Sequence, residues 1–243
     1  MARVKMIPPE TSEPETRKVY DGVLKQWGRI SNFSQVLAHQ PAALAGWMLP
    51  NEAIRLINVK ADPDYVKIQQ LVIIKTSALN GSAYCMSHNV PLGKKIGLTE
   101  AQIAAAQGDA YRASPDLDEK QKAAVRWAEA VTKMTARDDD DAFAEMKRHF
   151  SEKQIVELTV FCGMWNYSNR LCEALHVDLE RPDKRIEFQK EIGRPFERRI
   201  YRPHGEERRI AAKCTQAAPA MARLEPCAAW PILRDGRFAI SSG

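Results

Sequence analysis

Apolar residues recur along this chain at helical spacing. Between Pro14 and Gly28 the apolar positions are 19, 20, 23, 24 and 27, the stripe of an amphipathic helix with proline in its first turn and glycine at its end. The same spacing continues through residues 33–57, where Pro41 and Pro50 are expected to break the helices. No alternating run bounded by turn residues occurs, so the pattern predicts an all-α protein.

Two helices are predicted on either side of an Asn80-Gly81 turn. The first starts at Asp62-Pro63 and contains an unbroken apolar run at residues 71–74, which would also fit a strand. The distance from the proline to the Asn-Gly stop is too long for a strand and favours a buried helix. The second follows Ser82 and ends at Gly97; Pro91 inside it predicts a kink or a short non-helical start.

The later helices are marked by their first turns. Thr99 and Ser151 each precede a Gln at the third following position, which is the capping-box arrangement. A charged stretch at 138–141 predicts the start of another helix. The last core helix is expected over about residues 151–175.

Composition divides the chain into three parts. We expect an N-terminal arm and helix at 1–29, a single helical domain at 30–180, and a basic, Pro/Ala-rich extension at 181–243. Helical periodicity fades in the extension, and its apolar content is too low for a second core. We therefore expect weak order from about residue 190 onward.

The net charge of +5 belongs to the C-terminal extension alone. Residues 181–213 hold 11 basic and 6 acidic side chains, whereas residues 1–180 hold 22 basic and 23 acidic ones. The body of the protein therefore has no electrostatic preference for nucleic acid or anionic membranes. No apolar run is long enough to span a membrane and no secretory signal is evident, so a cytoplasmic protein is expected.

Five cysteines, odd in number and without a Cys-x-x-Cys pair, argue against a disulfide framework or a thiolate zinc site. Cys162 and Cys172 follow the apolar rhythm of the last helix and are expected in the core. A metal site using Cys85 and His88 would need two more ligands that the sequence does not nominate. No phosphate-binding loop, dinucleotide fingerprint or nucleophile elbow is present, so no metal or cofactor is expected.

Reactive side chains gather in only one segment, residues 80–89. On a helix, Ser82, Cys85 and His88 or Asn89 would share one face at spacings of three and four. Cys85 would lie in the first turn, where the helix dipole favours the thiolate. The alternative reading is that Cys and His three residues apart on an apolar helix are packing residues.

This segment, "IQQLVIIKTSALNGSAYCMSHNVPLGKKIGLTEAQIAA", with "FSEKQIVELTVFCGMWNYSNRLCEALHVDLE" after it, resembles the carboxymuconolactone decarboxylase family, which includes alkylhydroperoxidase D (AhpD)-like proteins. The resemblance covers about residues 30–180. It implies an all-helical fold that assembles as trimers or hexamers, with the site near subunit contacts.

The chain departs from the family's peroxidase motif, Cys-x-x-Cys-x-x-x-His with an upstream Glu as proton relay. When the two are aligned on the aromatic-Cys step, Ser82 stands at the first Cys, Cys85 at the second, Asn89 at the His and Gln70 at the Glu. A dithiol cycle is therefore implausible, because no resolving thiol lies within reach along this helix.

Family decarboxylases act on a small lactone acid without metal or organic cofactor, using a histidine and neighbouring polar groups. Here His88 lies one residue before the usual position, which rotates a helical side chain by about 100°. The first hypothesis is a cofactor-independent lyase or isomerase, with His88 as general acid/base and Tyr84, Ser82 and Asn89 as orienting groups.

Two alternatives remain open. One is a one-cysteine thiol peroxidase in which Cys85 forms a sulfenic acid that an external thiol reduces. The other is a binding or assembly protein that has lost catalysis. The expected partners are a small acid or hydroperoxide and further copies of the chain.

An arginine in the site would favour an acidic substrate, and Arg170 is the candidate. Its alternative role is a helix-end ion pair with Glu173 or Glu157.

Overall fold

The computed structural model describes residues 1–181, and these form helices joined by short loops, with no strand among them. The all-α prediction is confirmed. The α-helices are α1 (Pro14–Trp27), α2 (Asn32–Leu37), α3 (Pro41–Pro50), α4 (Ile57–Ala61), α5 (Pro63–Leu79), α6 (Ala83–Lys95), α7 (Glu100–Gln107), α8 (Glu119–Thr132), α9 (Asp140–His149) and α10 (Glu152–Ala174). A π-helical turn, η2 (Asn51–Leu56), and the 3-10 turns η1 (Pro9–Thr11) and η3 (Ala110–Arg112) complete the set.

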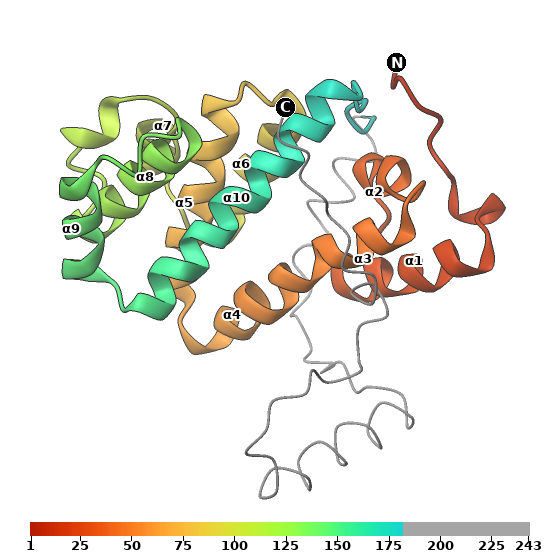
Figure 1. Cartoon of the computed structure of the whole chain (residues 1–243), viewed down its shortest axis with the longest axis horizontal. Coiled ribbons are helices and arrows are strands. Elements are labelled where there is room, and N and C mark those ends of the chain that lie inside the picture. The colour runs from red at the N-terminus through yellow and green to blue at the C-terminus, as the bar shows by residue number, and fades with distance from the viewer. Residues whose placement is uncertain (182–243) are drawn as a thin grey trace, which may run out of the picture. The chain divides into compact units, whose positions relative to one another are not determined.

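Helix α5 is the central element, and α6, α7, α8 and α10 all pack against it (Figure 1). Its segment Leu71–Ile74 is completely buried. A helix that is apolar on every side is stable only when neighbours cover every side, which explains the run that would otherwise fit a strand.

Local signals placed most helix ends correctly. Gly28 and Gly81 end α1 and α5 in the left-handed backbone region, at φ of 74° and 65°, where a residue without Cβ is favoured. The capping boxes predicted at Thr99 and Ser151 are both formed, because each side chain accepts from the backbone N–H three residues on. Asp118 forms a third capping box, before α8.

The break predicted at Pro50 is wrong. Helix α3 passes through Pro50 into η2 and then α4, so residues 41–61 form one continuous helical path. Proline cannot donate to the preceding turn, and the wider π-helical turn that follows accommodates the altered hydrogen bonding. The turn directs Asn51 and Arg55 inward, and both are buried.

Pro91 likewise lies inside α6, which is continuous from Ala83 to Lys95. The predicted non-helical start is therefore absent. Ser82 is at the N-cap position of α6, but its side chain makes no capping hydrogen bond there.

An aromatic cluster joins the N-terminal helices to α10. Trp47 of α3 lies between Phe33 and Trp165, with ring centroids 5.0 and 6.3 Å away. The Trp47 indole N–H donates to the Ser168 hydroxyl at 2.8 Å. Trp27 extends the cluster, its ring centroid 6.5 Å from that of Trp47. These large side chains hold α1–α3 against the central bundle.

The C-terminal half of α5 contributes Lys75 to a buried charge cluster. Lys75, fully buried, donates to the Gly108 carbonyl at 2.8 Å and lies 3.7 Å from the Glu129 carboxylate. Glu129 also accepts from Tyr111 at 2.6 Å. The charges are compensated within the cluster, which gives it a structural role.

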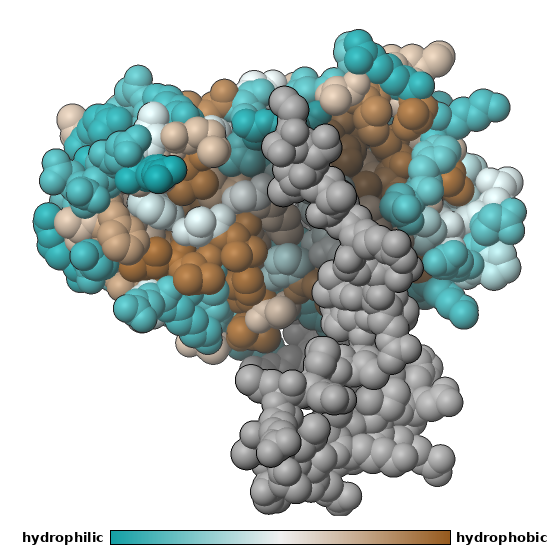
Figure 2. All heavy atoms as spheres, viewed as in Figure 1, coloured by the Kyte–Doolittle hydropathy of each residue, from teal (hydrophilic) through white to brown (hydrophobic). Residues whose placement is uncertain are grey.

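On the face shown in Figure 2, polar side chains lie around the periphery and apolar side chains reach the surface between them. The exposed apolar residues include Val156, Val160 and Tyr167 of α10. Within the described part of the chain, no helix has the length and apolar character needed to cross a membrane. The extension expected from about residue 190 lies outside the described residues.

Candidate functional site

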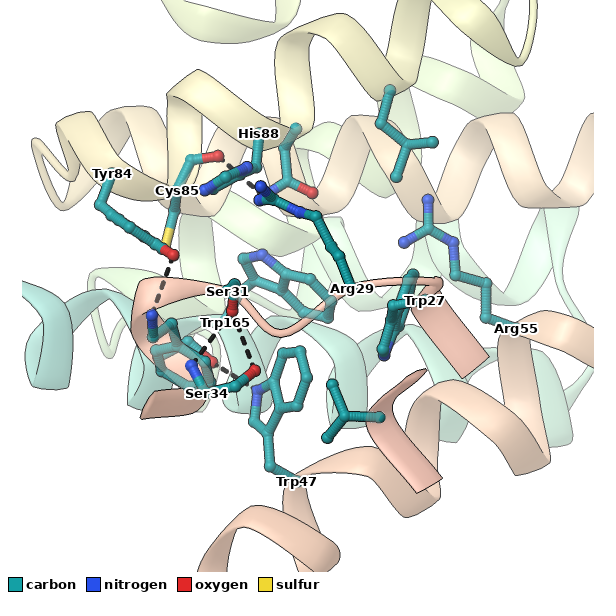
Figure 3. A pocket seen from close by; sticks show the side chains of 15 residues that line it. Trp27, Arg29, Ser31, Ser34, Trp47, Arg55, Tyr84, Cys85, His88 and Trp165 are labelled. Carbon is teal, nitrogen blue, oxygen red and sulfur yellow. Dashed lines mark hydrogen bonds between the residues drawn. The ribbon is translucent and has the colours of Figure 1, made fainter. Parts of the chain in front are cut away.

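A pocket of about 100 Å³ lies between the N-terminal helices, α6 and α10 (Figure 3). Most of its wall is aromatic or aliphatic, and the polar groups come mainly from α6, η2 and the loop after α1. The lining residues are Val23, Trp27, Arg29, Ser31, Phe33, Ser34, Trp47, Arg55, Tyr84, Cys85, His88, Asn89, Leu92, Trp165 and Ser168.

The sequence-nominated residues Tyr84, Cys85, His88 and Asn89 all line this pocket. The Asn80-Gly81 turn ends α5 and starts α6, so these residues fall in the first two turns of α6 and on its inward face. The rings of Tyr84 and His88 meet edge to face, with centroids 4.7 Å apart. The pocket thus joins a phenol, a thiol and an imidazole.

Glu180, which the sequence analysis did not nominate, completes the polar side of the site. Its Oε2 lies 2.7 Å from Nε2 of His88, and its Oε1 accepts from the Tyr84 hydroxyl at 2.8 Å. The backbone N–H of Asn32 donates to the same carboxylate at 2.9 Å, and the Arg29 guanidinium is 3.5 Å away. These contacts bring together residues from both ends of the domain.

The environment fixes Glu180 as a carboxylate. Burial alone would raise its pKa, but the hydrogen bond and charge of His88, with donors from Asn32 and Tyr84, outweigh it and lower the pKa to about 2. The pKa of Tyr84 is raised well above its ordinary value, first by burial and then by the Glu180 charge. Tyr84 therefore acts as a neutral donor.

The pKa of the Cys85 thiol is lowered. A hydrogen bond from Cys172 of α10 lowers its pKa, burial opposes this, and Ser82 and Asn169 lower it further. The start of α6 adds the favourable helix dipole. Cys162 differs, because burial is the main influence on its thiol and raises its pKa.

Gln70 takes no part in the pocket wall but positions two residues that do. Its amide nitrogen donates to the Asn89 backbone and side-chain oxygens, at 2.8 and 3.2 Å, and its oxygen accepts from the Arg55 guanidinium. The Asn89 amide in turn donates to the Cys85 carbonyl at 2.8 Å.

Arg55 lines the pocket while only 4% exposed. Among the described residues no carboxylate forms an ion pair with it, and burial lowers its pKa to about 10. A buried guanidinium without a carboxylate partner favours an anionic group beside it. Arg55 was not predicted as a site residue, because a helix break was expected at Pro50 and the helix instead continues through it.

Ser82 and Arg170 lie outside the pocket lining. Ser82 is completely buried at the start of α6, where its side chain lowers the pKa of Cys85. Arg170 is exposed on α10 and donates to the Asn166 backbone and side-chain oxygens at 3.2 and 2.5 Å. The expected cation is therefore present in the site as Arg55 and Arg29, and not as Arg170.

The residues that the structure describes contain no group of three or more His, Cys, Asp or Glu side chains arranged to hold a metal ion. The polar groups of the pocket are those of proton transfer and thiol chemistry.

Part of the chain matches a known protein family. Residues 66–130, from α5 into α8, match the carboxymuconolactone decarboxylase family. The uncharacterised protein YdfG of Bacillus subtilis is 27% identical over 108 residues, which cover 44% of this chain and 72% of YdfG.

Two solved structures share the fold. A protein of unknown function from Agrobacterium tumefaciens, named as a candidate antioxidant defence protein AhpD, is 26% identical with a TM-score of 0.53, covering 60% of this chain and 96% of its own. An AhpD-core, peroxidase-related protein from Ralstonia eutropha JMP134 is 16% identical with a TM-score of 0.63, covering 80% of this chain and 97% of its own.

Residues 66–130 therefore match the carboxymuconolactone decarboxylase family, and the chain has the helical fold of the AhpD-like solved structures. The name of that family and the description of the Ralstonia eutropha protein both refer to enzymes.

Proposed function

We propose that this protein is a cofactor-independent lyase or isomerase that acts on a small, largely apolar organic acid by general acid/base catalysis at His88. The observation that carries the proposal is the 2.7 Å contact between the His88 imidazole and the Glu180 carboxylate at the wall of the pocket.

Imidazole is suited to proton transfer because its ordinary pKa lies near neutrality. A carboxylate beside the ring stabilises the imidazolium, which is the form from which His88 donates a proton and the form left once it has accepted one from the substrate. Tyr84 and the Asn32 N–H hold Glu180 in place, so the carboxylate is already oriented before the substrate enters. Glu180 thus supplies a carboxylate in a site where Gln70 replaces the family's glutamate.

The pocket also indicates the substrate class. Its tryptophan-rich walls suit an apolar carbon skeleton of small size, since the volume is about 100 Å³. Arg55 would pair with the acidic group, and a guanidinium–carboxylate pair in a buried site is a charge-assisted interaction that fixes orientation. Asn89, held by Gln70, lines the pocket one turn after Cys85 on α6 and would add a polar contact.

The test is turnover of γ-carboxymuconolactone-type acids, followed by release of carbon dioxide or loss of ultraviolet absorbance. We expect His88→Ala to lower the rate by about 10²- to 10⁴-fold, the usual contribution of general acid/base catalysis. Arg170→Ala, at an exposed position on α10, is the matched control. Equal rates in wild type and His88→Ala would overturn the role given to His88.

A second candidate function is thiol peroxidase activity at Cys85. It is favoured by one specific observation: the thiol lines the pocket and its pKa is lowered, in contrast to that of Cys162. Consumption of an organic hydroperoxide with an external thiol as reductant, lost in Cys85→Ser and retained in Cys162→Ser, would establish it. Absence of turnover with both substrate classes would favour the remaining alternative, a binding protein without catalytic activity.

A further inference from the structure

The pocket contains a pair of serine hydroxyls in addition to its cation. Ser31, at the N-cap of α2, and Ser34, in the first turn of α2, both line the pocket, and their hydroxyl oxygens lie 2.9 Å apart. The Ser31 oxygen also accepts from the backbone N–H of Ser34 at 3.1 Å. In the view of Figure 3 this serine pair lies to the left of the Trp165 ring, whereas Arg55 lies to the right, beyond Trp27.

The serine pair has one hydroxyl hydrogen that its own contacts do not use. Two hydroxyls carry two hydrogens, and the contact between them uses one, whichever hydroxyl donates. Neither hydroxyl donates to any other group in the described part of the chain. Ser34 is only 3% exposed, and a hydroxyl buried beside a pocket gains a partner when a ligand oxygen accepts from it. The pair therefore favours a ligand with an oxygen acceptor at this place.

Arg55 can bind a carboxylate without losing its existing partner. Its Nη2 donates to the side-chain oxygen of Gln70, and a guanidinium has five N–H donors in all. The other donors allow the two-point contact with a carboxylate that arginine favours. Because Gln70 is neutral, the ligand's carboxylate would supply the counter-charge that this buried side chain lacks.

The apolar wall of the pocket is built from aromatic rings. The ring centroid of Trp47 lies 5.0 Å from that of Phe33, 6.3 Å from that of Trp165 and 6.5 Å from that of Trp27, and all four side chains line the pocket. The three pairs are tilted by 56°, 50° and 39°, so the wall presents both ring faces and ring edges. Such a wall favours a flat aromatic ring over an aliphatic ring of similar size, because aromatic pairs gain stability beyond the area that they bury.

We propose that the pocket binds an aromatic carboxylic acid with an oxygen substituent on its ring, the class to which the hydroxybenzoic acids belong. The carboxylate pairs with the Arg55 guanidinium, the ring packs against the tryptophans, and the substituent oxygen accepts from the serine pair. The inference names the substrate class of the proposed function, and it rests on that proposal only for the role of Arg55 as partner of the acidic group.

Calorimetric titration of the full chain with four matched ligands tests the inference. 4-Hydroxybenzoate has all three features, whereas benzoate lacks the oxygen substituent, trans-4-hydroxycyclohexanecarboxylate lacks the aromatic ring, and 4-hydroxybenzamide lacks the charge. We expect 4-hydroxybenzoate to bind about 2- to 10-fold more tightly than benzoate or the cyclohexane acid, the range expected for one hydrogen bond or one aromatic contact. It should bind about tenfold or more tightly than the amide.

The double variant Ser31→Ala/Ser34→Ala should bind 4-hydroxybenzoate and benzoate with equal affinity. Both serines are replaced because either hydroxyl could supply the donor hydrogen. Ser114→Ala is the matched control, because Ser114 is also buried but lies outside the pocket lining, where it contacts Asp116. The control should keep the wild-type preference for 4-hydroxybenzoate.

The wild-type ligand series decides the outcome if the double variant does not fold. Failure of 4-hydroxybenzoate to bind, or wild-type affinity for any of the other three ligands equal to that for 4-hydroxybenzoate, would overturn the inference, and so would a preference over benzoate that persists in the double variant. Binding of 4-hydroxybenzoate without turnover of any organic acid would contradict the proposed function alone. Turnover of a lactone acid without binding of the aromatic acids would contradict this inference alone.

Discussion

The imidazole of His88 and the carboxylate of Glu180 lie 2.7 Å apart, although His88 belongs to α6 and Glu180 follows α10, the last helix described. This contact, together with the Tyr84 hydroxyl, joins the C-terminal end of the domain to the wall of the pocket. The same carboxylate therefore contributes to both the proposed chemistry and the stability of the fold.

Glu180→Gln should lower kcat for the organic-acid substrate by about 10- to 100-fold and leave KM nearly unchanged. The amide keeps the size and an acceptor for Tyr84 but removes the charge that stabilises a protonated His88. Steady-state kinetics separate the two constants. An increase in KM with constant kcat would instead mean that Glu180 contacts the substrate only in the ground state.

Stability should depend on pH through Glu180. Its pKa is lowered in the folded protein to about 2, so its contribution is present above the ordinary carboxyl pKa and disappears as the pH falls toward 2. The shift corresponds to a contribution on the order of 3 kcal/mol. Urea unfolding at pH 7 and pH 3 should show a smaller difference between wild type and Glu180→Gln at the lower pH. A difference that is constant with pH would exclude this linkage.

Arg55→Met should raise KM for the acidic substrate by about tenfold or more, because it removes the buried guanidinium without opening a cavity. The free energy of unfolding should change little, since no carboxylate in the described region loses an ion-pair partner and the loss of a buried charge offsets the loss of the Gln70 contact. Arg170→Met is the control and should leave KM unchanged. If both variants behave alike, Arg55 does not bind the substrate.

Tyr84→Phe should destabilise the fold by about 1–3 kcal/mol. The hydroxyl accepts from the buried N–H of Phe33 at 3.0 Å and donates to Glu180, so its removal leaves both groups without that partner. Chemical unfolding measures the effect, and Tyr167→Phe, at an exposed position on α10, serves as control. Equal stability of the two variants would contradict the role assigned to Tyr84.

Alkylation of Cys85 by iodoacetamide should reach half its maximal rate at a pH below the ~8.5 of a free cysteine, because the hydrogen bond from Cys172 stabilises the thiolate. In Cys172→Ser the midpoint should move, since a hydroxyl replaces the thiol donor. A midpoint at or above 8.5 in wild type would remove the physical basis of the thiol chemistry.

Features encoded by neighbouring residues were predictable from the sequence. The left-handed glycines, the capping boxes and the proline-led first turns fixed the ends of α1, α5 and α10, because each depends on a few adjacent residues. The cluster at residues 84–89 was found for the same reason, since helical spacing alone places those side chains on one face.

Features that depend on distant contacts were not predictable. Glu180 becomes part of the site only because the chain after α10 returns to α6, and Arg55 only because a π-helical turn carries the helix past Pro50. Cys172 joins the core cluster of Cys85 through the packing of α10 on α6, which no local pattern indicates. The trimeric or hexameric assembly stays a prediction.

Exchange of solvent deuterium into the substrate tests the central claim most directly, because it detects proton transfer whether or not decarboxylation follows. A γ-carboxymuconolactone-type acid would be incubated in deuterium oxide with wild type, His88→Ala or Arg170→Ala, and followed by nuclear magnetic resonance. The account predicts deuterium incorporation with wild type and Arg170→Ala and its loss with His88→Ala. Incorporation at the same rate in all three, or in none, would contradict a proton-transfer role for the His88–Glu180 pair.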